Sequence, residues 1–309
     1  MQTFISVVTT LYKSANYLER FVQLCERAFS ELECVNCEII MVNDGSPDNS
    51  LEKALELKEE YPNIVVVDLS RNFGHHYALW AGLSISKGEY IFTIDCDLEV
   101  SPLCLVNFMN RMKSGTNIDV VYGIQEVRKG HIVERLGGAL FYSIFNKISG
   151  IQMPKNVLTE NLMNRKYIDS LLKLGDKSLF LAGMYQWVGF NQVPLIVTKG
   201  LREGKSTYTL KKRIALTFQA ITSFSSYPLI VLLNVGFLIT TLSFIWGIGF
   251  IIYRVFNPDI VLLGFTSLFV LILFSLGIIV FSLGVIGLYI DRIFTQTKNR
   301  PTYIIREIY

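Results

Sequence analysis

Charged residues are missing from two long stretches in the last third of this 309-residue sequence. No Asp, Glu, Lys or Arg occurs from Ile214 to Tyr253, and none occurs from Ile260 to Ile290. A membrane-spanning helix needs about 20 mostly apolar residues, whereas a soluble core helix of this length carries polar residues along one side. This disfavours a pair of buried core helices. We therefore expect transmembrane helices over about residues 229–253 and 263–288.

The beginning of the sequence has neither a basic leader nor a long apolar region. We expect no cleavable signal peptide, so that the residues before the first span stay in the cytoplasm. Basic residues cluster on the outer flanks of the two spans, at Lys211, Lys212, Arg213, Arg292, Lys298, Arg300 and Arg306. The connection 254–259 has one Arg and one Asp. The positive-inside rule then predicts both termini in the cytoplasm and a hairpin loop outside.

Cysteine and histidine are scarce, with five and three residues respectively. Cys34 and Cys37 have C-x-x-C spacing, but no second pair or histidine cluster completes a zinc site. Thiols stay reduced in the cytoplasm, so we expect five free cysteines. The formal net charge of +3 is too small to argue for a nucleic-acid partner. The position of the basic residues beside the spans indicates contact with anionic lipid head groups instead.

Before the spans, short apolar runs alternate with segments of helical periodicity. The expected strands are 4–8, 38–42, 64–67, 90–94 and 120–122, and the expected helices are 16–29, a helix that ends near residue 60, and 77–86. This alternation predicts an α/β fold with a mainly parallel sheet covered on both faces. Ligands of such sheets bind beyond the carboxyl ends of the strands. Asp44 and Asp95 follow two of these ends, so we expect both in one crevice.

Two aspartates one residue apart, Asp95 and Asp97, follow the apolar run 90–94. Residues i and i+2 of an extended chain point the same way, so the two carboxylates can converge on one cation. Hard divalent ions such as Mg²⁺ are usually held by one or two carboxylates plus substrate phosphates. A bare D-x-D is more often an acidic loop or a helix cap, but its place at a strand end near Asp44 favours binding of a metal and a diphosphate. Glu99 is a candidate third ligand, directly or through water.

A set of ordered motifs carries a family resemblance. The motifs are Val42–Ser46 (VNDGS), Arg71–Gly74 (RNFG), Asp95–Leu98 (DCDL), Arg202–Tyr208 (REGKSTY), Gly287–Arg292 (GLYIDR) and Arg300–Tyr303 (RPTY). The first three are similar to motifs of family 2 glycosyltransferases. Together with the later motifs and the two spans, nearly the whole chain resembles the bacterial polyprenyl-phosphate glycosyltransferases, which are related to dolichyl-phosphate mannose synthase.

The resemblance implies a GT-A-like domain that binds a nucleotide-diphosphate sugar, in our expectation a UDP-sugar, and transfers the sugar with inversion to a polyprenyl phosphate such as undecaprenyl phosphate. It implies that Asp44 contacts the nucleotide base, with Tyr12 nearby. Asp95 and Asp97, joined by Glu99, would hold Mg²⁺ or Mn²⁺ against the diphosphate of the donor. The same analogy implies a multi-pass protein of the bacterial inner membrane, self-association, and a lipid-linked sugar used for cell-surface glycans.

The acceptor phosphate needs cations close to the membrane. The candidates are Arg128, Arg135, Arg202 and Lys205, with the hydroxyl of Ser206 beside them. Arginine suits this role because its planar guanidinium donates paired hydrogen bonds to phosphate. A solvated surface turn is the alternative for Arg128. The family has a flexible active-site loop at the position of Arg202, which implies a catalytic role for that residue.

The chain departs from the family before the L-M-x-R motif, where relatives often have an aspartate proposed as base or orienting group. The matching residue here is Thr159, followed by Glu160, and we expect Glu160 to orient the substrate or to act electrostatically. A base is also dispensable in principle, because a phosphate monoester has a second pKa of about 6 and is largely deprotonated at neutral pH. His75 and His76 are expected to begin a helix. They would either reach the donor phosphates or serve as cap and packing residues.

The predicted organisation is a catalytic domain over 1–208, an interfacial amphipathic helix over 209–227, a transmembrane hairpin over 228–292 and a cytoplasmic tail over 293–309. The amphipathic helix could instead pack on the catalytic domain. Other functions are weaker. A processive polysaccharide synthase would usually show a Q-x-x-R-W signature, which is missing. Transfer to another lipid, such as diacylglycerol, stays open. A non-catalytic membrane scaffold fits the altered segment at Thr159, but the intact Asp44, Asp95 and Asp97 oppose it.

Overall fold

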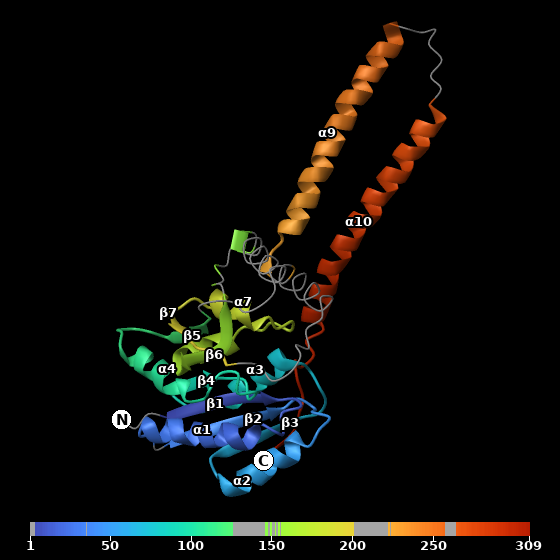
Figure 1. Cartoon of the computed structure of the whole chain (residues 1–309). Helices are drawn as coiled ribbons and strands as arrows, with labels where there is room; N and C mark the ends of the chain where they lie inside the picture. The colour runs from blue at the N-terminus through green and yellow to red at the C-terminus, as the bar shows by residue number, and fades with distance from the viewer. Residues whose placement is uncertain are drawn as a thin grey trace.

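The computed structural model describes residues 4–34, 36–125, 156–200, 224–256 and 264–309, together with the single residues 146, 147, 149, 152, 154 and 222. Within these residues the chain forms an α/β domain from which two long helices project on the same side (Figure 1). The strands of the domain are β1 (Phe4–Leu11), β2 (Asn36–Asn43), β3 (Ile64–Leu69), β4 (Tyr90–Thr93), β5 (Val120–Ile124), β6 (Val157–Asn164), β7 (Gln192–Ile196) and β8 (Ile305–Ile308).

The strands form one sheet in the order β7-β5-β6-β4-β1-β2-β3-β8. Its centre is parallel, as the sequence predicts, because β1 pairs in parallel with β2 and β4, and β2 pairs in parallel with β3. The sheet as a whole is mixed. β6 is antiparallel to β4 and β5, and β8 is antiparallel to β3, while β5 and β7 are parallel. Four of the seven strand pairs in the described residues are parallel, so the expected mainly parallel sheet is confirmed, with antiparallel pairs where β6 and β8 join it.

Helices cover both faces of the sheet. On one face lie α1 (Leu18–Glu31), α2 (Ser50–Glu60) and α4 (Cys104–Lys113), and on the other lie α3 (His75–Ile85), α6 (Arg165–Leu172) and α7 (Leu181–Trp187). Successive side chains of a strand point to opposite faces, so Val7 packs in the core beneath α1 while Val8 packs in the core beneath α3. The first three predicted helices are confirmed to within a few residues. Helix α4 was not predicted from the sequence.

Strand β6 is an addition to the predicted sheet. It carries Thr159, Glu160 and Asn161 near its middle, so no apolar run marks it in the sequence. It lies between β4 and β5, which follow one another in the predicted order. Because β6 is antiparallel to β4, Asn161 pairs with Thr93 at the end of β4. The first half of β6 is thereby brought to the carboxyl edge of the sheet, where ligands are expected.

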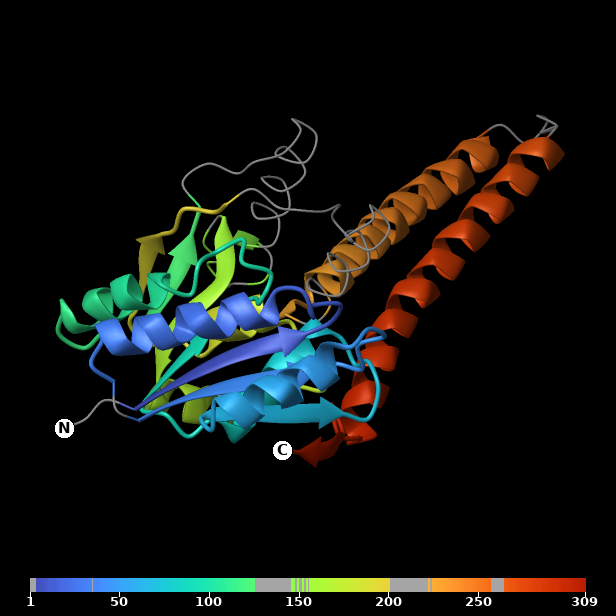
Figure 2. The same cartoon turned by 60° about the horizontal axis from the view of Figure 1, so that its bottom comes forward.

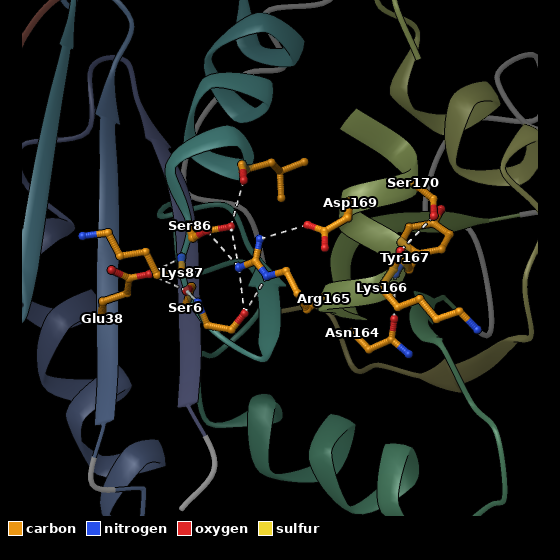
Figure 3. Close-up of polar contacts among 12 residues, drawn as sticks. Ser6, Glu38, Ser86, Lys87, Asn164, Arg165, Lys166, Tyr167, Asp169 and Ser170 are labelled. Atoms are coloured by element: carbon orange, nitrogen blue, oxygen red, sulfur yellow. Dashed lines mark hydrogen bonds and ion pairs between the residues drawn. The ribbon is translucent and has the colours of Figure 1, made fainter. Parts of the chain in front are cut away.

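Arg165, at the junction of β6 and α6, forms hydrogen bonds at the amino ends of the strands, opposite the edge where ligands are expected (Figure 3). Its guanidinium donates to the carbonyl oxygens of Ser86 and Gly88 at 2.8 and 2.7 Å, and it lies 3.8 Å from the carboxylate of Asp169. Gly88 in turn donates its N–H to the hydroxyl of Ser6 at the start of β1. The arginine of the L-M-N-R motif is therefore a structural residue at the amino ends of the strands.

Helices α9 (Tyr227–Phe256) and α10 (Phe265–Thr297) correspond to the two predicted spans. Their segments Tyr227–Trp246 and Phe274–Thr297 are long and apolar enough to cross a membrane, and neither is buried in the structure. A core helix of a soluble protein would be mostly buried, so these helices indicate association with a membrane. The predicted interfacial helix at 209–227 lies almost entirely outside the described residues.

The residues after the second span do not form a separate tail. The first of them complete α10, which ends at Thr297, and the last form β8 on the edge of the sheet beside β3. Figure 2 shows the chain leaving the foot of α10 and returning to the α/β domain. Arg292 of α10 also donates to Ser178 Oγ at 2.9 Å, and Gln296 accepts the N–H of Lys177 at 3.0 Å. The second helix and the domain are thus joined at more than one point.

The prediction of five free cysteines is wrong for one pair. Cys34 and Cys37 form a disulfide in the structure. Their Cα atoms lie 6.4 Å apart, within the range that a disulfide bridges. Cys25, Cys96 and Cys104 are free, as expected.

Candidate active site

A cavity of about 670 Å³ opens at the carboxyl edge of the sheet. This is the edge at which α/β sheets bind ligands. Its wall combines the end of β1, the loops after β2, β3 and β4, the first half of β6, and α7. Residues in this wall include Thr10, Tyr12, Asp44, Asn72, Gly74, His75, His76, Asp95, Cys96, Asp97, Glu99, Thr159, Glu160, Tyr185 and Lys199. The prediction that Asp44 and Asp95 share one crevice is confirmed.

Asp44 holds the turn that follows β3. Its Oδ1 accepts the N–H of Phe73 at 2.7 Å, and its Oδ2 accepts the N–H of Gly74 at 2.9 Å. The residue is buried, and burial raises the pKa of its carboxyl group, although the two backbone donors act in the opposite direction. Asp44 therefore builds the cavity wall. Its contact with a nucleotide base stays a prediction.

Gly45 permits the loops after β2 and β3 to approach each other closely. Its φ of 58° lies in the left-handed region that glycine adopts without strain. A Cβ at this position would lie 2.6 Å from the nitrogen of Asn72 and 2.7 Å from the carbonyl carbon of Arg71. The glycine of the N-D-G-S motif is therefore required for packing.

Asp95 lies where several segments meet. Its Oδ2 accepts a hydrogen bond from the hydroxyl of Thr159 at 3.0 Å, and its Oδ1 is 3.8 Å from Nε2 of His75. Nδ1 of His75 lies 3.0 Å from Oγ1 of Thr10, so β1 joins the same chain of contacts. Thr159, at the position where the family resemblance implied an aspartate, contacts Asp95 of the D-x-D motif directly. His75 begins α3 as predicted and lines the cavity.

The D-x-D motif is not extended, so the geometry assumed for it was wrong. Strand β4 ends at Thr93, and the chain turns through Cys96 and Asp97. Asp97 nevertheless lines the cavity, and its Oδ1 accepts the N–H of Glu99 at 3.1 Å. Burial raises the pKa of Asp97, and the charge of Asp95 adds to the increase. Cys96 is buried between the two acids, and burial raises the pKa of its thiol to about 12, as expected for an unreactive spacer.

Lys199 is a cation of the cavity wall that no sequence motif marks. Its Nζ forms an ion pair with Oε2 of Glu99, and the next residue, Gly200, donates its N–H to the carbonyl of Glu99 at 2.7 Å. Glu99 was a predicted metal ligand, but this ion pair turns its carboxylate toward Lys199. The pairing joins residues that lie far apart in the sequence, so local patterns give no signal for it.

Glu160 is nearly inaccessible to solvent, with 4% of its surface exposed. Its Oε2 is buried and has no hydrogen-bond partner among the described residues. Burial raises the pKa of the carboxyl group from 4.5 to about 7, the charges of Asp95 and Asp97 add to this increase, and Lys199 opposes it. Near neutral pH the group can therefore donate as well as accept a hydrogen bond. Its predicted orienting role is compatible with this position in the wall of the cavity.

Asp95 and Asp97 are the residues that could hold a divalent cation. Both carboxylates line a polar cavity, and such oxygen donors suit a hard cation that shares its coordination with substrate phosphates. Within the described part of the chain, no three His, Cys, Asp or Glu side chains are arranged as a metal site. The predicted set of Asp95, Asp97 and Glu99 is therefore not assembled in this structure, and the role of the two aspartates stays a prediction.

Two of the remaining candidates, Tyr12 and His76, lie in the described part of the chain, and the others do not. Tyr12 is half-exposed and lines the cavity, as the resemblance implies for a residue near the nucleotide. His76 has its Nδ1 3.3 Å from the carbonyl of Leu179 and also lines the cavity, and burial lowers its pKa, so both predicted roles, contact with the donor and packing, stay predictions. The residues proposed for the acceptor phosphate lie outside the described residues. They are Arg128, Arg135, Arg202, Lys205 and Ser206.

Comparison with known proteins gives matches over most of the chain. Residues 6–172 match glycosyl transferase family 2. A Mycobacterium tuberculosis protein named "Putative glycosyltransferases" is 36% identical over 305 residues, which cover 99% of this chain and 88% of that protein. A prophage-derived bactoprenol glucosyl transferase of Shigella flexneri is 32% identical over 308 residues, covering 98% and 97% of the two chains. The crystal structure of a mycobacterial protein is similar in fold, with a TM-score of 0.50 and 19% identity over 71% of this chain and 73% of that one.

Proposed function

The chain belongs to glycosyl transferase family 2 and is a glycosyltransferase, and we propose that it moves a hexose-type sugar from a nucleotide-diphosphate sugar to a polyprenyl phosphate. In this proposal the donor is a UDP-sugar, the acceptor is undecaprenyl phosphate, and the configuration of the anomeric carbon is inverted. The product is a lipid-linked sugar for the modification of cell-surface glycans.

The main support for this proposal is that one structure contains both an acidic cavity and two apolar helices long enough to cross a membrane. Asp95 and Asp97 line the cavity, whose wall includes α7. The segment just before α7 is bonded to the foot of α10, where Arg292 donates to Ser178 Oγ at 2.9 Å. A polar cavity held beside membrane segments suits an acceptor that has a charged head and a chain that stays in the lipid. The Shigella flexneri relative, named for a bactoprenol acceptor, supports the same class of lipid.

The return of the chain to the sheet supports a hairpin topology. β8 follows α10 and pairs with β3 of the catalytic domain. The end of α10 must therefore lie on the same side of a membrane as that domain, which also precedes α9. If both helices cross the bilayer, they cross it in opposite directions, in agreement with the distribution of basic residues. We propose that both termini and the catalytic domain are cytoplasmic in a bacterial inner membrane.

The proposed reaction forms a bond between an acceptor phosphate oxygen and the anomeric carbon, and it breaks the bond between that carbon and the donor diphosphate. A divalent cation, Mg²⁺ or Mn²⁺, would offset the charge that grows on the departing diphosphate. Asp95 and Asp97 would hold it, and the Thr159 hydroxyl fixes the orientation of the Asp95 carboxylate. A strong base is not required, because the acceptor phosphate is largely deprotonated at neutral pH. Glu160 orients a hydroxyl or a phosphate oxygen in the same cavity.

The test is to incubate the purified full-length protein, in lipid, with undecaprenyl phosphate, Mg²⁺ and a panel of labelled nucleotide sugars. We expect one preferred donor, a sugar–phosphate–lipid product, and loss of activity in Asp97→Ala. Asp169→Ala is the matched control, because Asp169 lies at the opposite edge of the sheet and its side chain is more than half exposed. Full activity of Asp97→Ala would rule out the assigned cation site. Transfer to diacylglycerol but not to undecaprenyl phosphate would rule out the proposed acceptor.

A further inference from the structure

We propose that Arg306, in the strand that follows the second span, is a positioning residue for two loops of the cavity wall. These loops, here called the donor loops, are residues 43–46 after β2 and residues 70–74 after β3. Asp44, Asn72 and Gly74 of the donor loops line the cavity. The inference rests on the proposed function only in naming this wall as the donor side.

Arg306 compensates a buried charge. Asp68 of β3 is 1% exposed, and its Oδ2 accepts a hydrogen bond from Nη1 of Arg306 at 2.9 Å. Its Oδ1 accepts a hydrogen bond from Nδ2 of Asn43 at 2.7 Å. A carboxylate removed from water is tolerated when it is paired and hydrogen-bonded, and removing the partner leaves an uncompensated charge. Arg306 therefore stabilises a buried carboxylate although its own side chain is 59% exposed.

The first donor loop depends on this arrangement through Asn43. The side-chain amide of Asn43 donates to Asp68 with its nitrogen and accepts the N–H of Ser46 with its oxygen, at 3.2 Å. The bond to Asp68 thus fixes which way the amide points, and the amide closes the turn from Asn43 to Ser46. If Asp68 moves, the turn loses the group that orients it.

The second donor loop is held by the same guanidinium. Nη2 of Arg306 donates to the carbonyl of Ser70 at 2.9 Å, and Ser70 donates its N–H to the carbonyl of Ile304 at 2.9 Å. The two loops are also joined to each other, because Asp44 accepts the N–H groups of Phe73 and Gly74. The guanidinium of Arg306 therefore contacts both donor loops, the first through Asp68 and Asn43 and the second through Ser70. A lysine, with its single ammonium group, cannot make both contacts in the same geometry.

Arg306 is not in the cavity wall, so its effect on a ligand must pass through the donor loops. The arginine reaches this place only because the chain turns back from α10 and pairs with β3. We infer that the strand after the second span holds the donor side of the cavity in its binding geometry and fixes that side relative to the membrane helices.

The first measurement needs no ligand. Hydrogen–deuterium exchange is followed in the full-length protein for wild type, Arg306→Ala and Arg306→Lys. We expect the amides of the donor loops to exchange about tenfold faster in Arg306→Ala, with a smaller increase in Arg306→Lys and no change in β1 or β4. Tyr303→Phe is the control, because it removes a 2.7 Å hydrogen bond between the returning chain and Ser84 without touching the donor loops.

The second measurement is the affinity for UDP and for GDP in the presence of Mn²⁺, by calorimetry on the same four proteins. We expect weaker binding in Arg306→Ala, partial recovery in Arg306→Lys, and the wild-type value in Tyr303→Phe. The acceptor KM should stay unchanged, so that the effect separates from a general loss of folded protein. Unchanged exchange in the donor loops of Arg306→Ala, or an increase spread equally over the whole sheet, would overturn the inference. If the wild type binds neither nucleotide, the proposed donor fails while the exchange experiment still decides the role of Arg306.

Discussion

Replacing Glu160 by glutamine is expected to stabilise the protein above neutral pH. Burial raises the pKa of this carboxyl group from 4.5 to about 7, so the folded protein binds more protons than the unfolded chain between these values. Stability therefore falls as the pH rises through this window, because the carboxyl group must ionise in a buried place. Each pKa unit corresponds to about 1.4 kcal/mol, so the penalty at about pH 8 amounts to about 3 kcal/mol. Glutamine has a similar shape and carries no charge, which removes the penalty.

The assay is thermal unfolding of the full-length protein in detergent with EDTA, from about pH 5 to about pH 8. EDTA is needed because a cation at Asp95 and Asp97 would favour the ionised form of Glu160. For a domain of this size, about 3 kcal/mol corresponds to roughly 6–12 °C in the melting temperature. We expect Glu160→Gln to melt higher than wild type at the upper pH by about this amount and to match it near pH 5. Glu59→Gln, on the exposed side of α2, is the control and should follow the wild-type curve.

The same experiment can refute the reasoning. If wild type and Glu160→Gln show parallel melting curves over the whole pH range, Glu160 is not a buried acid with a raised pKa. A variant that is less stable than wild type at about pH 8 would show that the ionised carboxylate is stabilised in the folded protein, for instance by Lys199. Lys199→Met provides a second check. Lys199 lowers the pKa of Glu160, so removing this cation should raise that pKa and extend the loss of stability to higher pH values, and an unchanged pH dependence would contradict this.

Three further substitutions test the cavity wall. Asp44→Asn should lower the free energy of unfolding by about 1–3 kcal/mol, because an NH2 group replaces one of the two accepting oxygens and then faces a backbone donor, and unchanged denaturant unfolding would contradict this. Gly45→Ala should destabilise the domain more than an alanine placed elsewhere on its surface, because its Cβ would lie 2.6 Å from the nitrogen of Asn72, and wild-type expression and melting would argue against this packing. Thr159→Asp puts a second carboxylate beside Asp95, so its melting temperature should rise with Mg²⁺ more than that of wild type, and an equal response would count against a cation at this place.

Much of the domain can be predicted from local patterns. Apolar runs and helical periodicity located β1 to β4, the helices between them, and the two apolar helices, because each of these signals lies within a single segment. The aspartates at the strand ends were found in the same way. The carboxyl ends of parallel neighbours meet at one edge of a sheet, so the position of Asp44 and Asp95 follows from the strand order alone.

Contacts between distant segments could not be predicted in this way. β6 carries polar residues in its middle and enters the sheet between β4 and β5, which brings Thr159 to Asp95 across 64 positions of sequence. The pairing of Lys199 with Glu99 also belongs to this class. None of these has a local periodicity that would mark it.

The sequence by itself determined that this is an α/β domain with helices on both faces of its sheet and with acidic strand ends, followed by two helices suited to a membrane. Only the tertiary structure decided which side chains meet those acids and where the chain ends. Arg306 lies 238 positions after Asp68 and contacts it because β8 adds to the edge of the sheet beside β3. The physical reason is that local propensity acts over a few residues, whereas the pairing of a buried charge depends on which strands come together in the folded sheet.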